Sequence, residues 1–166
     1  MQSTALVFGV DSDSIIPYES GTPRLQYSIK IPKDKPATLE WTYQTQPNQA
    51  LLYRLSSGDS NHIHVDNSAS EMLGTGKQTP LLHGLLTLAI AFRAVSKLAC
   101  KNDRLHRLEG KFTKPGFVGD ELLVKVWSED SVRFLFIVTN KETGATLIDK
   151  GLAEFEATGS SPISKM

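Results

Sequence analysis

Apolar residues occupy nearly every side of one long segment, residues 80–100, if that segment is helical. They recur at spacings of three and four residues, which predicts a helix, and an apolar circumference is typical of a helix surrounded by protein. The apolar positions are Leu81, Leu82, Leu85, Leu86, Leu88, Ala89, Ile90, Phe92 and Val95. Because His83, Arg93 and Lys97 interrupt the segment and charge is costly in lipid, we expect a buried helix and no membrane span.

Beyond residue 100 the hydrophobic period changes to two, which is typical of strands with one buried face. The alternating or strongly apolar runs are residues 104–112, 121–128, 132–139 and 145–156. Short turns join the last three runs, and Gly144 is able to take a positive φ in one of them. An antiparallel sheet wrapped around a single central helix satisfies this burial pattern, so the predicted fold class is α+β.

The first part of the chain is more weakly patterned. Residues 5–10 and 24–31 are candidate strands, whereas two prolines interrupt residues 32–36, which is typical of a linker. Residues 38–45 are expected to be extended. A short helix should follow and end at Gly58, because glycine favours the left-handed conformation that closes a helix.

Composition excludes some classes of protein. Lys plus Arg and Asp plus Glu number 18 each, so the formal net charge is zero, which argues against binding to nucleic acid. The single cysteine, Cys100, excludes an intramolecular disulfide. The apolar run at the N-terminus has no basic residues before it, so we expect no secretory signal.

Two stretches carry side chains suited to acid–base chemistry. Residues 53–64 are Tyr-Arg-Leu-Ser-Ser-Gly-Asp-Ser-Asn-His-Ile-His, in which Asp59, Asn61 and His64 have the spacing D-x-N-x-x-H. Residues 80–85 are Pro-Leu-Leu-His-Gly-Leu and open the apolar segment. Gly-Asp-Ser-Asn is also ordinary turn chemistry, so neither stretch identifies a function by itself.

Together with Gly-Lys-Phe-Thr-Lys-Pro and the Gly-Asp that follows it, these motifs resemble the R-specific enoyl-CoA hydratases of the MaoC-like group. The resemblance covers residues 45–156 and is closest to the C-terminal, catalytic half of the eukaryotic peroxisomal hydratase domain. It implies a hot-dog fold, in which a curved antiparallel sheet wraps around a long apolar central helix. It also implies a lyase without a cofactor, which reversibly hydrates trans-2-enoyl-CoA to (3R)-3-hydroxyacyl-CoA in peroxisomal fatty-acid oxidation or fungal-type secondary metabolism.

The resemblance assigns catalytic roles to four residues. It implies that Asp59 and His64 hold and activate a water molecule, that Asn61 positions this pair, and that the backbone N–H of Gly84 faces the thioester oxygen. A base and an acid close together suit the addition of water to Cβ and of a proton to Cα on one face. An N–H at a helix N-terminus suits the negative charge of the enolate.

Four further residues are candidates for substrate binding: His83, Arg54, Lys111 and Lys114. The two lysines are candidates for contacts with CoA phosphates, although scattered surface charge explains them equally. His83 is also explained as a structural residue that satisfies backbone groups near the start of the helix.

Three other functions remain open. A hot-dog thioesterase shares the fold but directs water to the carbonyl carbon. A non-catalytic acyl-CoA-binding module is suggested by the added serine in Ser56–Ser57 and by His62, which replaces the family's usual proline. A metal-assisted hydrolase would need His62, His64 and Asp66 on one side of an extended strand. We expect no metal ion, because loss of the proline accounts for His62.

The eukaryotic relatives have two hot-dog units, and 45 residues cannot hold a complete first unit. We therefore expect residues 1–45 to be a remnant of a first unit with its linker, residues 46–157 the catalytic domain, and residues 158–166 a flexible tail. A homodimer is expected to replace the missing unit.

The last three residues, Ser164, Lys165 and Met166, resemble the peroxisomal address Ser-Lys-Leu. This motif implies a peroxisomal import receptor as a partner and a peroxisomal location.

Overall fold

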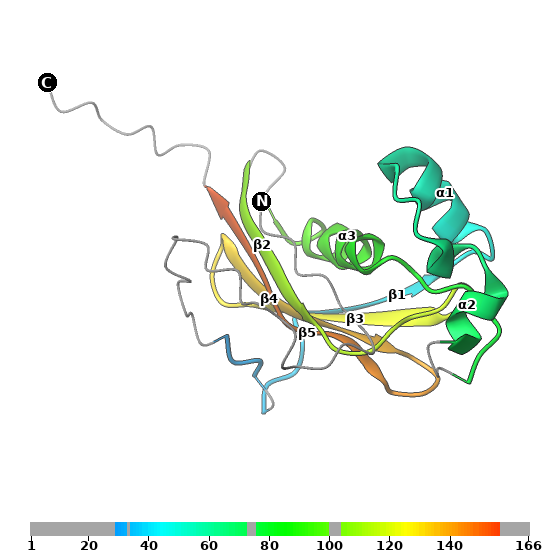
Figure 1. The fold of residues 1–166 in the computed structure, drawn as a ribbon. Coiled ribbons are helices and arrows are strands. Elements are labelled where there is room, and N and C mark those ends of the chain that lie inside the picture. Colours follow the sequence, from blue (N-terminus) through cyan, green and yellow to red (C-terminus); the bar gives the residue numbers. More distant parts are fainter. Residues whose placement is uncertain (1–28, 33, 73–75, 100–103, 157–166) are drawn as a thin grey trace, which may run out of the picture.

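The computed structural model describes residues 29–32, 34–72, 76–99 and 104–156 (Figure 1). The strands are β1 (Leu39–Gln44), β2 (Arg104–Phe112), β3 (Glu121–Ser128), β4 (Arg133–Asn140) and β5 (Thr146–Glu156). The helices are α1 (Gln49–Ser57), the short 3-10 helix η2 (His62–His64), α2 (Asn67–Met72) and α3 (Gly84–Val95). All strand pairs are antiparallel and the order is β1-β3-β4-β5-β2, which confirms the predicted fold class.

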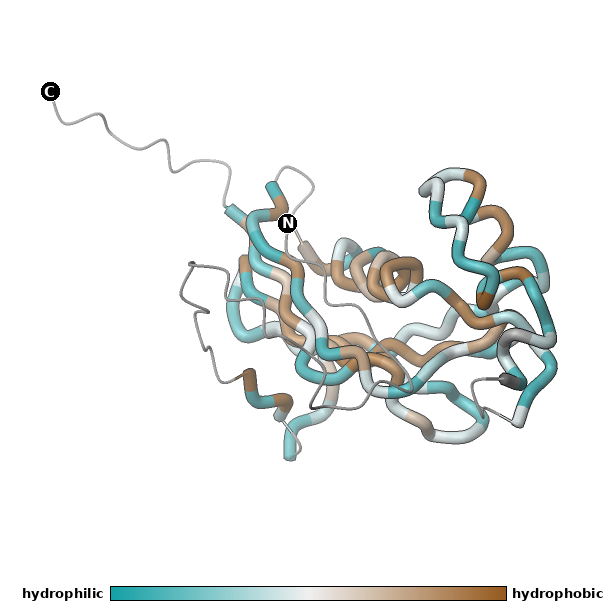
Figure 2. Tube along the Cα trace, in the orientation of Figure 1, coloured by the Kyte–Doolittle hydropathy of each residue, from teal (hydrophilic) through white to brown (hydrophobic). Residues whose placement is uncertain are grey.

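Helix α3 lies along one face of the sheet, with α1 and α2 grouped near one end (Figure 1). Alternate residues of β3 point toward α3, as the sequence period predicts, and Leu122, Val124 and Val126 are fully buried. They pack in one apolar cluster with the buried side of α3, which includes Ile90 and Ala94 (Figure 2). Burial of each large side chain stabilises the fold by about 1.5–3 kcal/mol, so this cluster fixes α3 on the sheet.

As expected, protein surrounds α3 on most sides, but one stripe of the helix is exposed. The helix has 12 residues, fewer than the apolar segment, and Leu85 is 57% exposed on a stripe that continues through Ala89 and Arg93. The residues before Gly84 are held instead by the loop between β2 and β3. The N–H of Leu82 donates to the carbonyl of Gly116 at 2.8 Å, and this contact replaces helical hydrogen bonding.

The outer face of the sheet carries a second apolar cluster, formed by Trp127, Leu135 and Leu152. Ile29, Ile31 and Ala37 cover it, and the indole N–H of Trp127 donates to the carbonyl of Lys35 at 3.0 Å. The segment with the composition of a linker is therefore packed on the sheet.

Strand β1, which the sequence analysis placed ahead of the catalytic domain, is an edge strand of the same sheet. The folded unit thus begins before the expected boundary at residue 46. The candidate strand at residues 5–10, Cys100 and the C-terminal tail lie outside the described residues.

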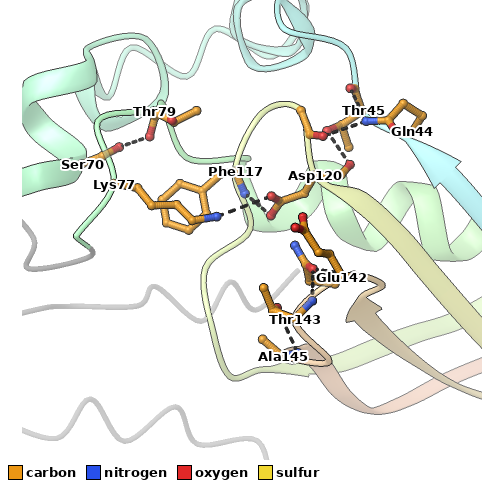
Figure 3. A network of polar contacts seen from close by, with 12 residues as sticks. Gln44, Thr45, Ser70, Lys77, Thr79, Phe117, Asp120, Glu142, Thr143 and Ala145 are labelled. Carbon is orange, nitrogen blue, oxygen red and sulfur yellow. Dashed lines mark hydrogen bonds and ion pairs between the residues drawn. The ribbon is translucent and has the colours of Figure 1, made fainter.

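Asp120 ties the loop between β2 and β3 to two other parts of the chain (Figure 3). Its carboxylate accepts a hydrogen bond from the backbone N–H of Phe117 at 2.9 Å and lies 3.7 Å from the ammonium group of Lys77. Its backbone carbonyl accepts the hydroxyl of Thr45 at 2.8 Å, at the end of β1. The Gly-Asp motif of this loop therefore has a structural role, because Asp120 anchors the loop.

Among the described helices, none has the length and apolar character needed to cross a membrane.

Packing at Gly151 gives a test of the fold. A Cβ atom added there would lie 2.3 Å from Cδ2 of Phe136, whose ring is fully buried. Gly151→Ala should therefore lower the free energy of unfolding by about 1–3 kcal/mol, measured by urea denaturation, because a packed core absorbs extra volume poorly. The double variant with Phe136→Leu should lose less stability than the sum of the losses of the two single variants, because the smaller side chain makes room for the added methyl group. An alanine variant as stable as the parent would contradict this packing.

Candidate active site

The candidate site begins directly after the last turn of α1. Gly58 takes a φ of 74° and its N–H donates to the carbonyl of Arg54 at 2.9 Å, which closes the helix as predicted. The helix extends to Ser57, so the added serine is accommodated within its final turn. Asp59 follows directly and is exposed.

The side chains of Asp59 and Asn61 shape the next turn. A carboxylate oxygen of Asp59, Oδ1, accepts the N–H of Asn61 at 3.0 Å. The side-chain oxygen of Asn61 accepts the N–H of Ile63 at 3.3 Å and caps the 3-10 helix η2. Asn61 therefore positions the residues on either side of it, and Oδ2 of Asp59 is left to face the interior of the site.

His64 is 8% exposed, and its Nδ1 lies 2.8 Å from the backbone carbonyl of Leu81. A carbonyl oxygen only accepts hydrogen bonds, so Nδ1 carries the proton in this contact. In the neutral ring Nε2 then has the free lone pair, which is the arrangement a general base requires.

Backbone hydrogen bonds bring the second motif beside the first. The N–H of Leu81 donates to the carbonyl of Ile63 at 3.0 Å, and the N–H of Val118 donates to the carbonyl of Pro80 at 3.1 Å. Residues 80–83 are thus held between η2 and the loop between β2 and β3, which Asp120 anchors. The structure brings together the two stretches that the sequence analysis singled out.

His83 lies at the centre of the site and is 2% exposed. Its ring stacks on that of His64 with centroids 3.6 Å apart, and Tyr53 contacts it with a centroid distance of 4.6 Å. Nε2 of His83 lies 3.8 Å from Oδ2 of Asp59. Burial lowers the pKa of His83 to about 4, and the charges of His64 and Arg54 add to this effect while Asp59 opposes it.

The geometry does not suit a metal ion, although Asp59, His64 and His83 each present a ligand-type atom within 4.8 Å of the others. The two rings are stacked 3.6 Å apart with planes only 20° apart, so their in-plane lone pairs lie in separate, nearly parallel planes. Zinc needs nitrogen lone pairs that converge at about 2.0–2.1 Å. The alternative set with His62 and Asp66 required an extended strand, and residues 62–64 form a 3-10 helix instead.

Gly84 is the first residue of α3 and is exposed. The first N–H groups of a helix have no partner within it, and the helix dipole favours negative charge there. A Cβ atom at this position would lie 3.1 Å from Cε1 of Phe112. A larger residue at this position would require the Phe112 ring to shift by a few tenths of an ångström, so the packing favours glycine.

The other candidate binding residues differ in their surroundings. Lys111 and Lys114 are exposed on either side of Phe112, the ring that contacts Gly84. Arg54 is half-buried on α1, and no described residue hydrogen-bonds its Nη1. Its positive charge acts on His83, which places the guanidinium beside the site.

A pocket of about 310 Å³ lies beside His64. Its lining is mostly apolar and comprises Pro47, Asn48, Ala50, Leu51, His64, Val65, Pro80 and Val118. An apolar pocket that borders a buried acid–base group is the usual form of a small-molecule site.

The arrangement of His83 is the part of this site that the sequence analysis missed. It treated His83 as a substrate-binding or structural residue, and the stack with His64 and the approach to Asp59 were not anticipated. The signal was present, because His83 stands directly before Gly84 in the second motif.

Comparison with known proteins agrees with this geometry. Residues 28–150 match the family described as the MaoC-like domain. The chain is 37% identical over 123 residues to peroxisomal enoyl-CoA hydratase 2 of Arabidopsis thaliana, a match that covers 73% of this chain and 38% of the relative. It is 34% identical over 130 residues to probable enoyl-CoA hydratase 2 of Dictyostelium discoideum, covering 77% and 44%. The chain therefore spans less than half the length of these curated relatives.

Among solved structures, the MaoC-like dehydratase of Phytophthora capsici superposes with a TM-score of 0.74 and 32% identity, covering 86% of this chain and 50% of that one. The family match extends over most of the chain, and the sheet, the helix and the two motifs occupy the places that the resemblance implied. The chain belongs to the MaoC-like domain family and has its hot-dog fold.

Proposed function

We propose that the chain is an R-specific hydratase that reversibly converts trans-2-enoyl-CoA into (3R)-3-hydroxyacyl-CoA. The observation that carries this proposal is the placement of Asp59 and His64 beside the N-terminus of α3. The names of the relatives as enoyl-CoA hydratases support the same activity.

The chemistry assigns a role to each group. The oxygen of a water molecule attacks Cβ of the enoyl group while Asp59 and His64 take up its proton, and a proton is delivered to Cα on the same face. Electrons shift from the double bond onto the thioester oxygen, and the N–H of Gly84 stabilises that charge. When the carbonyl re-forms, water has been added and both side chains have regained their starting protonation.

The surroundings of this centre suit an acyl-CoA thioester. The apolar pocket beside His64 is proposed to receive the acyl chain. Lys111 and Lys114 are exposed and are proposed to contact the CoA phosphates, while Arg54 adds positive charge at the site. No cofactor is needed, because water and the acid–base pair complete the reaction.

Asp59→Asn and His64→Ala test this proposal. Each should reduce the rate of hydration of crotonyl-CoA or a longer enoyl-CoA by about 100-fold or more, because general acid–base catalysis contributes on that order. The measurement is the loss of enoyl absorbance, with chiral analysis of the product and unchanged circular dichroism.

His62→Ala is the matched control, because His62 is exposed on the same 3-10 helix and should keep the parental rate. Release of free CoA while the enoyl absorbance persists would identify a thioesterase instead. Parental hydration by both site variants would refute the assignment.

We further propose a homodimer with two-fold symmetry, in which the sheets of two chains pair and the two sites lie near the interface. Strands β1 and β2 are the edges of the sheet, and α1 exposes Leu51, Leu52 and Leu55 at 47%, 52% and 74%. Both features favour contact with a partner.

Light scattering on the purified chain should give twice the 18.3 kDa mass of one chain. Leu52→Glu combined with Leu55→Glu should weaken the association, because it places charge on the apolar surface of α1. A fully active species at the mass of one chain that persists on dilution would exclude this assembly.

We also propose a peroxisomal location, with Ser164, Lys165 and Met166 bound by the import receptor. The peroxisomal names of the Arabidopsis and mouse relatives support this location. A fluorescent protein fused ahead of the chain, with its C-terminus free, should accumulate in peroxisomes and become cytosolic when these three residues are deleted. Equal peroxisomal import of both forms would contradict the proposed signal.

A further inference from the structure

His83 raises a question that packing alone does not answer. Both of its ring nitrogens are buried, and no described residue hydrogen-bonds either of them. Buried polar atoms usually have partners, because removal from water without a hydrogen bond is costly. A phenylalanine would form the same stack between Tyr53 and His64 without that cost. The presence of a histidine therefore points to a use for its nitrogens.

The atoms around His83 define a position for one water molecule. A carboxylate oxygen of Asp59 and one ring nitrogen each of His64 and His83 lie within 4.8 Å of one another. Three atoms at such separations share a point about 2.8 Å from each, which is an ordinary hydrogen-bond distance. The 3.8 Å between Nε2 of His83 and Oδ2 of Asp59 is too long for a direct hydrogen bond but is easily bridged by an oxygen atom.

The same point that is unsuitable for a metal is suitable for water. The lone pairs of stacked rings lie in nearly parallel planes, so they do not converge on one ion at the short distance that a metal requires. A hydrogen bond remains effective when it is bent moderately from linearity.

We propose that His83 is a further catalytic residue, whose ring N–H donates a hydrogen bond to the oxygen of the reacting water. This inference rests on the hydratase function proposed above. The water donates one O–H to Asp59 and the other to Nε2 of His64, and it accepts one hydrogen bond from His83. One lone pair is then left, and it is directed to Cβ of the enoyl group. In dehydration the same N–H stabilises the oxygen that leaves Cβ.

Burial is the main factor that keeps this donor uncharged, and the charges of His64 and Arg54 add to it, whereas the charge of Asp59 opposes it. Tyr53 and Arg54 face His83 from α1, His64 from η2 and Asp59 from the turn before η2. A neutral His83 has one N–H to offer, and the negative charge of Asp59 stays available to the water. A charged His83 would form an ion pair with Asp59 and withdraw the base.

Two substitutions separate the nitrogens from the ring. His83→Phe keeps a flat ring in the stack but removes the donor, so kcat should fall at least about tenfold while KM changes little. His83→Gln removes the ring but places an amide N–H near the position of Nε2, so it should recover part of the lost rate. His62→Phe is the matched control, because it makes the same change at an exposed histidine and should keep the parental rate.

Stability gives an independent readout. His83→Phe removes two buried nitrogens that no described residue hydrogen-bonds, so its urea midpoint at neutral pH should equal or exceed that of the parent, in contrast to the loss of rate. The pKa of His83 is lowered from 6.5 to about 4 in the folded protein. Below pH 6.5 the unfolded chain therefore binds a proton at His83 that the folded chain does not bind. The free energy of unfolding of the parent is unaffected by this group above pH 6.5 and falls as pH decreases toward 4. The parent midpoint should therefore drop more between pH 7 and pH 5 than that of His83→Phe.

The outcomes distinguish this inference from the function on which it rests. A parent without hydratase activity would refute the proposed function. An active parent and an equally active His83→Phe would refute only the role of His83. A His83→Gln variant that is folded but no faster than His83→Phe would assign the effect to the stacked ring and overturn the proposed donor. A pH-dependent drop no larger in the parent than in His83→Phe would overturn the neutral, buried state of the ring.

Discussion

The two backbone groups of Leu81 hold the site in one arrangement. Its N–H bonds to the carbonyl of Ile63, and its carbonyl accepts Nδ1 of His64. Both contacts run to the same 3-10 helix, and Leu81 is almost fully buried. Movement of either segment would leave polar groups unpaired away from water, so the segment before α3 and the side chain of His64 are fixed together.

This fixation has a local cost in stability. The His83 imidazole and one guanidinium nitrogen of Arg54 are buried without a hydrogen bond from any described residue, and this works against folding. The apolar cluster between α3 and the sheet offsets that cost, with Phe134 and Phe136 among its largest members. Conflicts between local chemistry and folding are expected at functional sites, because the reaction there needs polar groups that the core does not.

Local signals in the sequence predicted the parts of the structure that depend on neighbouring residues. Gly58 closes α1, as glycine placement indicated, and the apolar spacing predicted a helix that contains α3. Alternation identified β3 and its buried face, and a strongly apolar run identified β4, because each pattern is intrinsic to its segment.

Contacts between distant residues were less accessible to that analysis. Strand β1 joins the sheet through pairing with β3, more than 75 residues later, and nothing within residues 39–44 specifies that partner. The stack of His83 on His64 depends on how the backbone of Leu81 meets η2, so motif spacing alone did not reveal it. The alternation of His62, His64 and Asp66 was misleading because the chain there is helical.

The structural role of Asp120, which anchors the loop between β2 and β3, affects how a loss of activity in variants of this residue should be interpreted. An acidic residue in a shared Gly-Asp motif invites assignment as an acid or a base. Here its carboxylate holds the N–H of Phe117 and approaches Lys77, while its carbonyl holds Thr45. Through the loop it supports residues 80–83. A variant of Asp120 that lost activity would therefore indicate displacement of the supporting loop, not loss of an acid or a base. A sequence motif of this kind contains residues that hold the site in place as well as residues that react.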